Sequence, residues 1–225
     1  MSPDDPAREG VLLLHGIARS PAAMRPLERT LASAGYATLN LGYPARRCDL
    51  AGCAEAIAPA FTAFAARVKR IHIVTHSMGG LVARVLLTRC RPDNLGRVVM
   101  LGPPSQGSEV ADALHRLSLY RRFFGPAGAE LVTRRESALE ARLGRVDYPL
   151  GIIAGHRSLY PLASRLWLCG PNDGRVTVAR TRLDGMADHI VLPVAHPTMM
   201  RAPRVRTETL RFLMEGRFSA DNTDA

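Results

Sequence analysis

The sequence predicts an α/β protein built on a mostly parallel sheet, and two observations predict it. Short apolar runs rich in branched residues recur along the 225 residues, and each is followed by a longer segment of helical character. Strands that alternate with helices in this way form βαβ units, whose crossovers leave the strands parallel. A hydrophobic content of 47% supplies one well-developed core. A single domain over residues 1–225 is therefore expected.

The apolar runs place about six strands, and the periodic segments between them place the flanking helices. The expected strands are residues 11–14, 37–41, 71–75, 98–101, 150–154 and 190–192. The expected helices are residues 21–34, 51–68, 78–90, 177–181 and 203–215.

The interval 107–147 is longer than a plain crossover between two strands. Its apolar residues are interrupted by Gly125-Pro126, and they are Leu114, Leu117, Leu119, Tyr120, Phe123 and Phe124. We expect a small helical cap inserted into the domain. The alternative is a crossover helix whose apolar stripe packs on the sheet. The polar tail 219–225 is expected to fray.

The formal charge of +10 raises nucleic acid and anionic membranes as partners. The basic residues are scattered arginines without aromatic residues between them for base stacking, which disfavours nucleic acid. They form only short groups, such as Arg46-Arg47, Arg121-Arg122 and Arg134-Arg135. A solvated basic surface is expected, with weak contact to an anionic surface left open.

The start of the chain and its cysteines bear on the compartment. Residues 1–6 lack the basic start and apolar run of a signal peptide, and no stretch reaches the roughly 18 to 20 apolar residues of a membrane span. A cytoplasmic protein is expected. Cys48, Cys53, Cys90 and Cys169 form no metal-ligand pattern and are expected as free thiols. A Cys48–Cys53 disulfide is the alternative if the protein is exported.

The segment 75–80, with the sequence THSMGG, carries the first chemical signal. It follows the branched run 71–74 and opens a helical stretch, so it predicts a tight turn between strand and helix. Such a turn holds a serine in a strained conformation, with its Oγ exposed and the helix amides directed at the reaction centre. Ser77 is thus a candidate nucleophile. Thr75 stands where the usual pattern has glycine, and its branched side chain needs room beside the helix.

A second motif, LLLHGI at residues 12–17, is a buried strand that ends in His-Gly. Together the two motifs resemble those of the lipase-like α/β hydrolases. In that family a strand followed by His-Gly supplies one oxyanion-hole amide, which the resemblance assigns to Ile17, and the residue after the nucleophile supplies the other, here Met78. His15 is expected to stabilise the loop.

The resemblance also orders the rest of the site, because in this family the acid follows the next-to-last strand and the base follows the last. Asp173 lies in the turn-forming segment PNDG after the strand at 150–154, and it fits the acid. Its alternative role is to form the turn by its own hydrogen bonds. His196 follows the last strand and fits the base.

Other acids and histidines are weaker candidates for these roles. Asp147, Asp184, Asp188 and His189 precede their strands and would lie at the opposite edge of the sheet. Structural roles are expected for His72, His76, His115 and His156, although His156 follows a strand at the edge that would border the pocket.

The resemblance extends over about residues 11–218 and implies the α/β-hydrolase fold and an acyl-enzyme mechanism without metal or organic cofactor. The loop at residues 101–108 resembles one that lipases carry. It implies cleavage of a hydrophobic, lipid-like carboxylic ester. Acyl transfer and thioester hydrolysis use the same triad and stay open. A non-catalytic binding module of this fold and a nucleic-acid binder are the alternatives of other classes. None of these motifs identifies the substrate or the oligomeric state.

Overall fold

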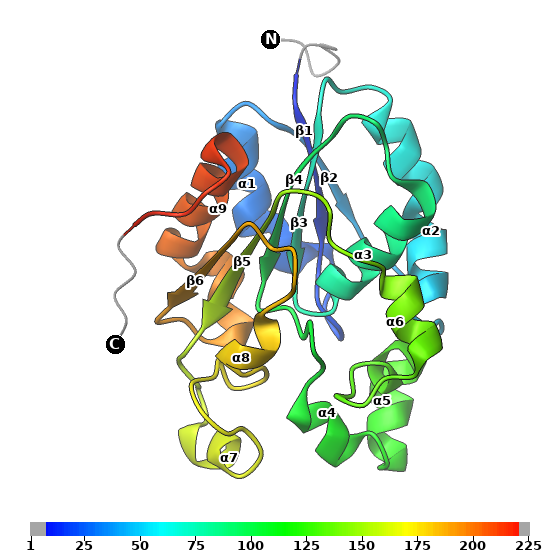
Figure 1. Cartoon of the computed structure of the whole chain (residues 1–225), viewed down its shortest axis with the longest axis vertical. Coiled ribbons are helices and arrows are strands. Elements are labelled where there is room, and N and C mark those ends of the chain that lie inside the picture. Colours follow the sequence, from blue (N-terminus) through cyan, green and yellow to red (C-terminus); the bar gives the residue numbers. More distant parts are fainter. Residues whose placement is uncertain (1–7, 221–225) are drawn as a thin grey trace.

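The computed structural model describes residues 8–220. The six expected strands form one parallel sheet in the order β2-β1-β3-β4-β5-β6 (Figure 1). Their bounds are β1 Gly10–Leu14, β2 Ala37–Leu41, β3 Ile71–His76, β4 Leu95–Leu101, β5 Leu150–Gly155 and β6 Asp188–Leu192. The predicted fold class is confirmed. The expectations for residues 1–6 and for the tail beyond residue 220 lie outside the described residues.

Two strands begin earlier than their apolar runs indicated. β4 starts at Leu95, which pairs with Ile71, and β6 starts at Asp188, which pairs with Gly151. Hydrogen bonding to a neighbouring strand extends a strand into residues that carry no apolar pattern. His189 therefore lies within β6 rather than before it.

Helices cover both faces of the sheet, with α1 and α9 on one face and α2 and α3 on the other (Figure 1). Alternate residues of β1 belong to different cores. Val11 and Leu13 pack on the side of α1 and α9, whereas Leu12 and Leu14 pack on the side of α2 and α3. The period of two along a strand produces this division, and burial of both faces explains why β1 is a continuous apolar run.

The helices that form these layers agree closely with the expected ones. Their bounds are α1 Arg25–Ser33, α2 Leu50–Ala65, α3 Gly79–Cys90, α8 Val178–Thr181 and α9 Pro203–Glu215. The helix expected at 21–34 starts as a 3-10 turn, η1 Pro21–Met24, before α1. A second such turn, η2 His196–Arg201, follows β6.

The segment between β4 and β5 contains three helices, α4 Glu109–Leu114, α5 Ser118–Ala129 and α6 Ser137–Leu143. Helices α4 and α5 lie beyond the carboxyl ends of the strands, whereas α6 lies beside α3 (Figure 1). Gly125, at φ 66°, breaks the helical path within α5 immediately before Pro126, where the sequence interrupts the apolar pattern.

One helix at this edge was not expected from the sequence. α7 Pro161–Arg165 lies in the long connection between β5 and Asp173, and it projects from the same edge as α4 and α5 (Figure 1). The four cysteines are free thiols.

Candidate active site

Ser77 occupies the sharp turn between β3 and α3. Its φ of 55° lies in the left-handed region, which costs a non-glycine residue energy. Two backbone hydrogen bonds hold this conformation: Ser77 N–H donates to Leu101 O at 2.8 Å, and Gly80 N–H donates to Ser77 O at 2.9 Å. The turn therefore presents Ser77 at the carboxyl edge of the sheet.

The residues around the turn show why small side chains are needed after the serine. A Cβ on Gly79 would lie 2.7 Å from the carbonyl oxygens of both Leu14 and His15. A Cβ on Gly80 would lie 3.3 Å from Thr75 Oγ1. Thr75 itself is fully buried. The absence of a side chain at Gly80 thus leaves room for threonine at the position where glycine is usual.

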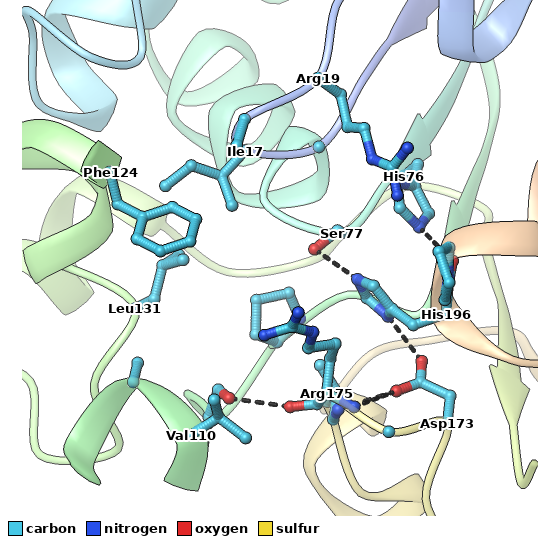
Figure 2. A pocket seen from close by; sticks show the side chains of 18 of the residues that line it. Ile17, Arg19, His76, Ser77, Val110, Phe124, Leu131, Asp173, Arg175 and His196 are labelled. Atoms are coloured by element: carbon cyan, nitrogen blue, oxygen red, sulfur yellow. Dashed lines mark hydrogen bonds and ion pairs between the residues drawn. The ribbon is translucent and has the colours of Figure 1, made fainter. Parts of the chain in front are cut away.

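His196, at the start of η2, lies between Ser77 and Asp173. The Nε2 of His196 is 3.0 Å from Ser77 Oγ, and its Nδ1 is 2.7 Å from Asp173 Oδ2 (Figure 2). A carboxylate can only accept, so Nδ1 carries the proton and Nε2 is free to accept from the serine hydroxyl. The structure brings together the three residues that the sequence proposed for a triad.

The carboxylate of Asp173 is held from several directions. Its Oδ1 accepts hydrogen bonds from the N–H groups of Arg175, at 2.9 Å, and Val176, at 2.8 Å. The N–H of His196 donates to Asp173 O at 3.0 Å, which ties the base-bearing turn to the acid-bearing turn. Asp173 thus has both roles considered in the sequence analysis. Its Oδ1 stabilises the turn, and its Oδ2 accepts from His196.

The loop after β1 approaches the serine turn closely. A Cβ on Gly16 would lie 2.9 Å from His76 Nδ1 and 3.0 Å from Ser77 Cβ. His15 stabilises this loop, because its ring donates to Gly16 O at 2.8 Å and stacks on Tyr43 at 4.5 Å. Burial lowers the pKa of His15.

The two N–H groups assigned to the oxyanion hole belong to the loop after β1 and to the serine turn. Ile17 lines the pocket beside Ser77, and Met78 is the first residue after the serine. Within residues 8–220, neither the Ile17 N–H nor the Met78 N–H donates to a protein acceptor. Free N–H groups of this kind are what an oxyanion requires.

A cavity of about 320 Å³ opens above Ser77. Its apolar side is formed by Ile17 together with residues of α4, α5 and the loop after α5, namely Val110, Ala111, Phe123, Phe124 and Leu131. Its polar side contains His76 and His196, with Arg19 beside His76 and Arg175 on the turn that carries Asp173 (Figure 2). In Figure 2 Arg19 lies beside His76, whereas Arg175 lies on the other side of Ser77, between Val110 and His196. The pocket therefore has a hydrophobic side and two cationic side chains that reach it from different directions.

The weaker candidates lie elsewhere and have other partners. His189 Nε2 is 2.9 Å from Thr181 Oγ1 within the fold. Asp147 pairs with Arg91, and Asp188 accepts from Phe218 N–H at 2.7 Å. His72 Nδ1 accepts from the N–H of Arg97. His156 is not among the described residues that line the cavity.

Sequence reasoning missed several residues of the site. His76, for which only a structural role was expected, is buried and contacts His196. The loop that carries α7 supplies Ser158, Leu159 and Tyr160 to the pocket. The apolar residues of this loop, Leu159 and Tyr160 among them, were the signal in the sequence that could have found it.

Two further features concern partners. Of the helices in residues 8–220, none combines the length and apolar character that a membrane span requires. In the same part of the chain, no cluster of three or more His, Cys, Asp or Glu side chains has the arrangement of a metal site.

A family model described as a PGAP1-like α/β domain matches residues 50–134, from the start of α2 to just beyond α5. No curated protein matches the chain. Among solved structures, the chain is similar to the mature form of the Bacillus licheniformis lipase BlEst2. The identity is 21% and the TM-score 0.68, with 93% of this chain and 92% of the lipase covered.

Two other solved structures show the same likeness. The Pyrococcus furiosus esterase PF2001 has 19% identity and a TM-score of 0.61, with 94% of this chain and 82% of the esterase covered. The phospholipase PlaB of Legionella pneumophila has 17% identity and a TM-score of 0.69, with 94% of this chain covered. The chain spans 60% of the phospholipase's length. These likenesses confirm the predicted α/β-hydrolase fold.

Proposed function

We propose that this chain, which has the α/β-hydrolase fold, is a carboxylic ester hydrolase with Ser77 as its nucleophile. The observation that carries the proposal is the continuous hydrogen-bonded row from Ser77 through His196 to Asp173, built on a serine with φ of 55°. A strained serine that donates to an oriented imidazole is the arrangement of an activated nucleophile.

The geometry supports a two-step reaction. Ser77 Oγ attacks the ester carbonyl carbon while its proton passes to His196 Nε2. The bond to the alcohol oxygen then breaks, and His196 gives its proton to that leaving oxygen. In the second step water attacks the acyl carbon and loses its proton to His196. The bond between the acyl carbon and Ser77 Oγ then breaks, His196 returns the proton to Oγ, and the carboxylic acid leaves. Asp173 holds the tautomer and stabilises the imidazolium.

The negative charge that develops on the carbonyl oxygen would be bound by the Ile17 and Met78 amides. Their lack of a protein acceptor in the described part of the chain supports this role. Loss of one such donor typically costs about a hundredfold to a thousandfold in rate.

The apolar side of the pocket supports a hydrophobic acyl group as the part of the substrate that binds there. α4 and α5 would form the small cap over this side. A chain-length series of aryl esters tests this proposal. A preference for charged or very short acyl groups would contradict it.

The residues at the mouth of the pocket support the proposal that the substrate is lipid-like and is presented at a lipid surface. Leu159 and Tyr160 line the cavity and are also exposed, and they continue into the exposed Leu162, Leu166 and Trp167 around α7. An exposed apolar patch of this kind is typical of an interaction site. With a formal charge of +10, the protein favours anionic surfaces. We therefore propose weak contact of this rim with anionic lipid.

An acyltransferase or a thioesterase would use the same residues and differ in the acceptor or in the leaving atom. Product analysis with added alcohol, and comparison of an ester with its thioester, separates these activities. A non-catalytic binding module predicts no acyl-enzyme at all.

Labelling with a fluorophosphonate, which reacts with activated serines, tests the proposal. The wild type should be labelled at one site, and both Ser77→Ala and His196→Ala should abolish labelling and lower turnover by several orders of magnitude. Ser108→Ala is the matched control, because Ser108 also lines the pocket but donates its hydroxyl to Arg175 O at 2.9 Å. Full labelling of a folded Ser77→Ala variant would remove Ser77 from the mechanism.

A further inference from the structure

Two exposed arginines border the pocket without a partner. Arg19 and Arg175 both line the cavity, yet within residues 8–220 neither guanidinium forms an ion pair or a hydrogen bond. Other arginines near the site are engaged. Arg135 donates to the carbonyl oxygens of Pro104 and Ser105, and Arg180 pairs with Glu109 at 2.9 Å. The two pocket arginines therefore have their donors available to a ligand.

The backbone positions of both arginines are held by the fold. Arg19 follows Ala18, whose φ of 53° is the second left-handed conformation at a non-glycine residue in the described chain. Backbone strain of this kind persists where the surrounding structure imposes it, and it gathers at functional sites. Arg175 donates its N–H to Asp173 Oδ1 at 2.9 Å, so its backbone belongs to the acid-bearing turn. Both positions are thus set relative to Ser77.

No free acid in the pocket compensates the positive charge of the two arginines. Asp173 is the only acid among the described residues that line the cavity, and its carboxylate accepts from His196, Arg175 N–H and Val176 N–H. His76 adds no charge at neutral pH, because burial, with the neighbouring His196 as a smaller cause, lowers its pKa well below the usual value. An anion that enters the pocket thus meets two free guanidinium groups and no free carboxylate.

We infer that Arg19 binds an anionic group, a carboxylate or a phosphate, carried by the alcohol part of the ester, and that Arg175, on the other side of Ser77 in Figure 2, strengthens the attraction of that anion into the pocket. The inference rests on the proposed function, because it uses the direction in which the ester lies. The acyl chain occupies the side of Ile17, Phe124 and Leu131, opposite Arg19 in Figure 2. His196 protonates the leaving oxygen, so the alcohol lies on the side of the histidine, where Arg19 is found. Guanidinium groups suit carboxylate and phosphate oxygens, which accept two parallel hydrogen bonds.

Two esters of equal shape provide the test, 3-(butanoyloxy)benzoate and the neutral 3-(butanoyloxy)benzamide. The wild type should prefer the anionic ester, measured as the ratio of the two kcat/KM values. Arg19→Gln and Arg175→Gln should each lower this ratio by about threefold to tenfold, as for partly solvated charge pairs, and the double variant should lower it further. Arg175→Glu should invert the preference. Arg157→Gln, at an exposed position outside the pocket, is the matched control and should keep the wild-type ratio.

A binding measurement separates this inference from the proposed function. Calorimetry of 3-hydroxybenzoate with the wild type and with the two glutamine variants needs no turnover. Binding that is weakened in both variants, and weakened by raising NaCl from 0.05 to 0.5 M, supports the subsite even if neither ester is cleaved. The same ratio and the same product affinity in wild type, Arg19→Gln and Arg175→Gln would overturn the inference while leaving ester hydrolysis intact. A phosphate-bearing ester in place of the benzoate distinguishes the two anions.

Discussion

His76 is hydrogen-bonded to His196: the Nε2 of His76 donates to the backbone carbonyl oxygen of His196 at 3.0 Å. The two rings lie 4.7 Å apart between centroids. His76 Nδ1 is buried and has no hydrogen-bond partner among the described residues. The residue directly before the serine therefore holds the backbone that carries the base.

His76→Ala should lower kcat by about tenfold to a hundredfold and leave KM nearly unchanged. Loss of the donor frees the turn of His196, and a small misplacement of a catalytic group has effects of this size. His76→Gln keeps an N–H donor and should restore part of kcat. Steady-state kinetics of folded protein, checked by circular dichroism, measures both. A purely structural role predicts lower stability with wild-type kcat per folded molecule.

Thr75→Val should leave the unfolding free energy unchanged or raise it by about 1 kcal/mol. Thr75 Oγ1 is buried without a hydrogen-bond partner in the described chain, and valine removes that polar atom while keeping the shape. Thr75→Gly restores the residue usual at this position, but it should cost about 1 kcal/mol or more through lost packing and a freer unfolded chain. Urea unfolding of the two variants compares them directly. A clear loss of stability in Thr75→Val would point to a hydrogen bond made by the hydroxyl.

Stability should fall as the pH drops from about 6.5 to about 4, in part because of His189. Burial lowers the pKa of His189 from 6.5 to about 4, and its Nδ1 has no hydrogen-bond partner in the described chain. Within this window the unfolded state binds the proton and the folded state does not. The stability that comes from keeping His189 neutral is therefore fully present above pH 6.5 and is lost as the pH falls toward 4, a loss on the order of 3 kcal/mol.

His189→Gln tests this origin, since glutamine keeps a donor for Thr181 but does not titrate. Urea unfolding at pH 7.5, 5.5 and 4.5 should give a shallower pH dependence for the variant than for the wild type. Equal slopes would assign the acid sensitivity to other groups, such as the buried His72 and His76, whose pKa values burial also lowers.

The double variant Leu162→Ser/Leu166→Ser should lower binding to anionic phosphatidylglycerol vesicles and hydrolysis of an emulsified ester, each by about fivefold or more. The two side chains are 82% and 77% exposed beside the pocket mouth, and each apolar side chain removed from water contributes to binding. Met214→Ser is the matched control, because Met214 is 63% exposed on α9, away from the pocket. Vesicle sedimentation measures binding. Equal sedimentation of the double variant and the wild type would remove the rim from surface contact.

Much of the fold could be predicted because its information is local. A strand buried on both faces must be continuously apolar, as β1 is, and the helices between the strands then require a parallel sheet. The turns of the site are local as well. The left-handed serine depends on Gly79 and Gly80 two and three residues further on, and the turn at Asp173 is formed by its own bonds to Arg175 and Val176.

The sequence by itself thus determined the sheet, the positions of Ser77, Asp173 and His196 along the chain, and the order in which they occur. Only the tertiary structure decided what surrounds them. The parallel register sets the ends of β1 and β3 side by side, Leu14 against Thr75, and so brings Gly16 against the serine turn. The contact of His76 with His196 spans 120 positions, and Arg19 and Arg175 line one pocket across a still longer separation in the sequence. Such contacts have no periodicity or spacing along the chain, because they arise from packing between distant elements.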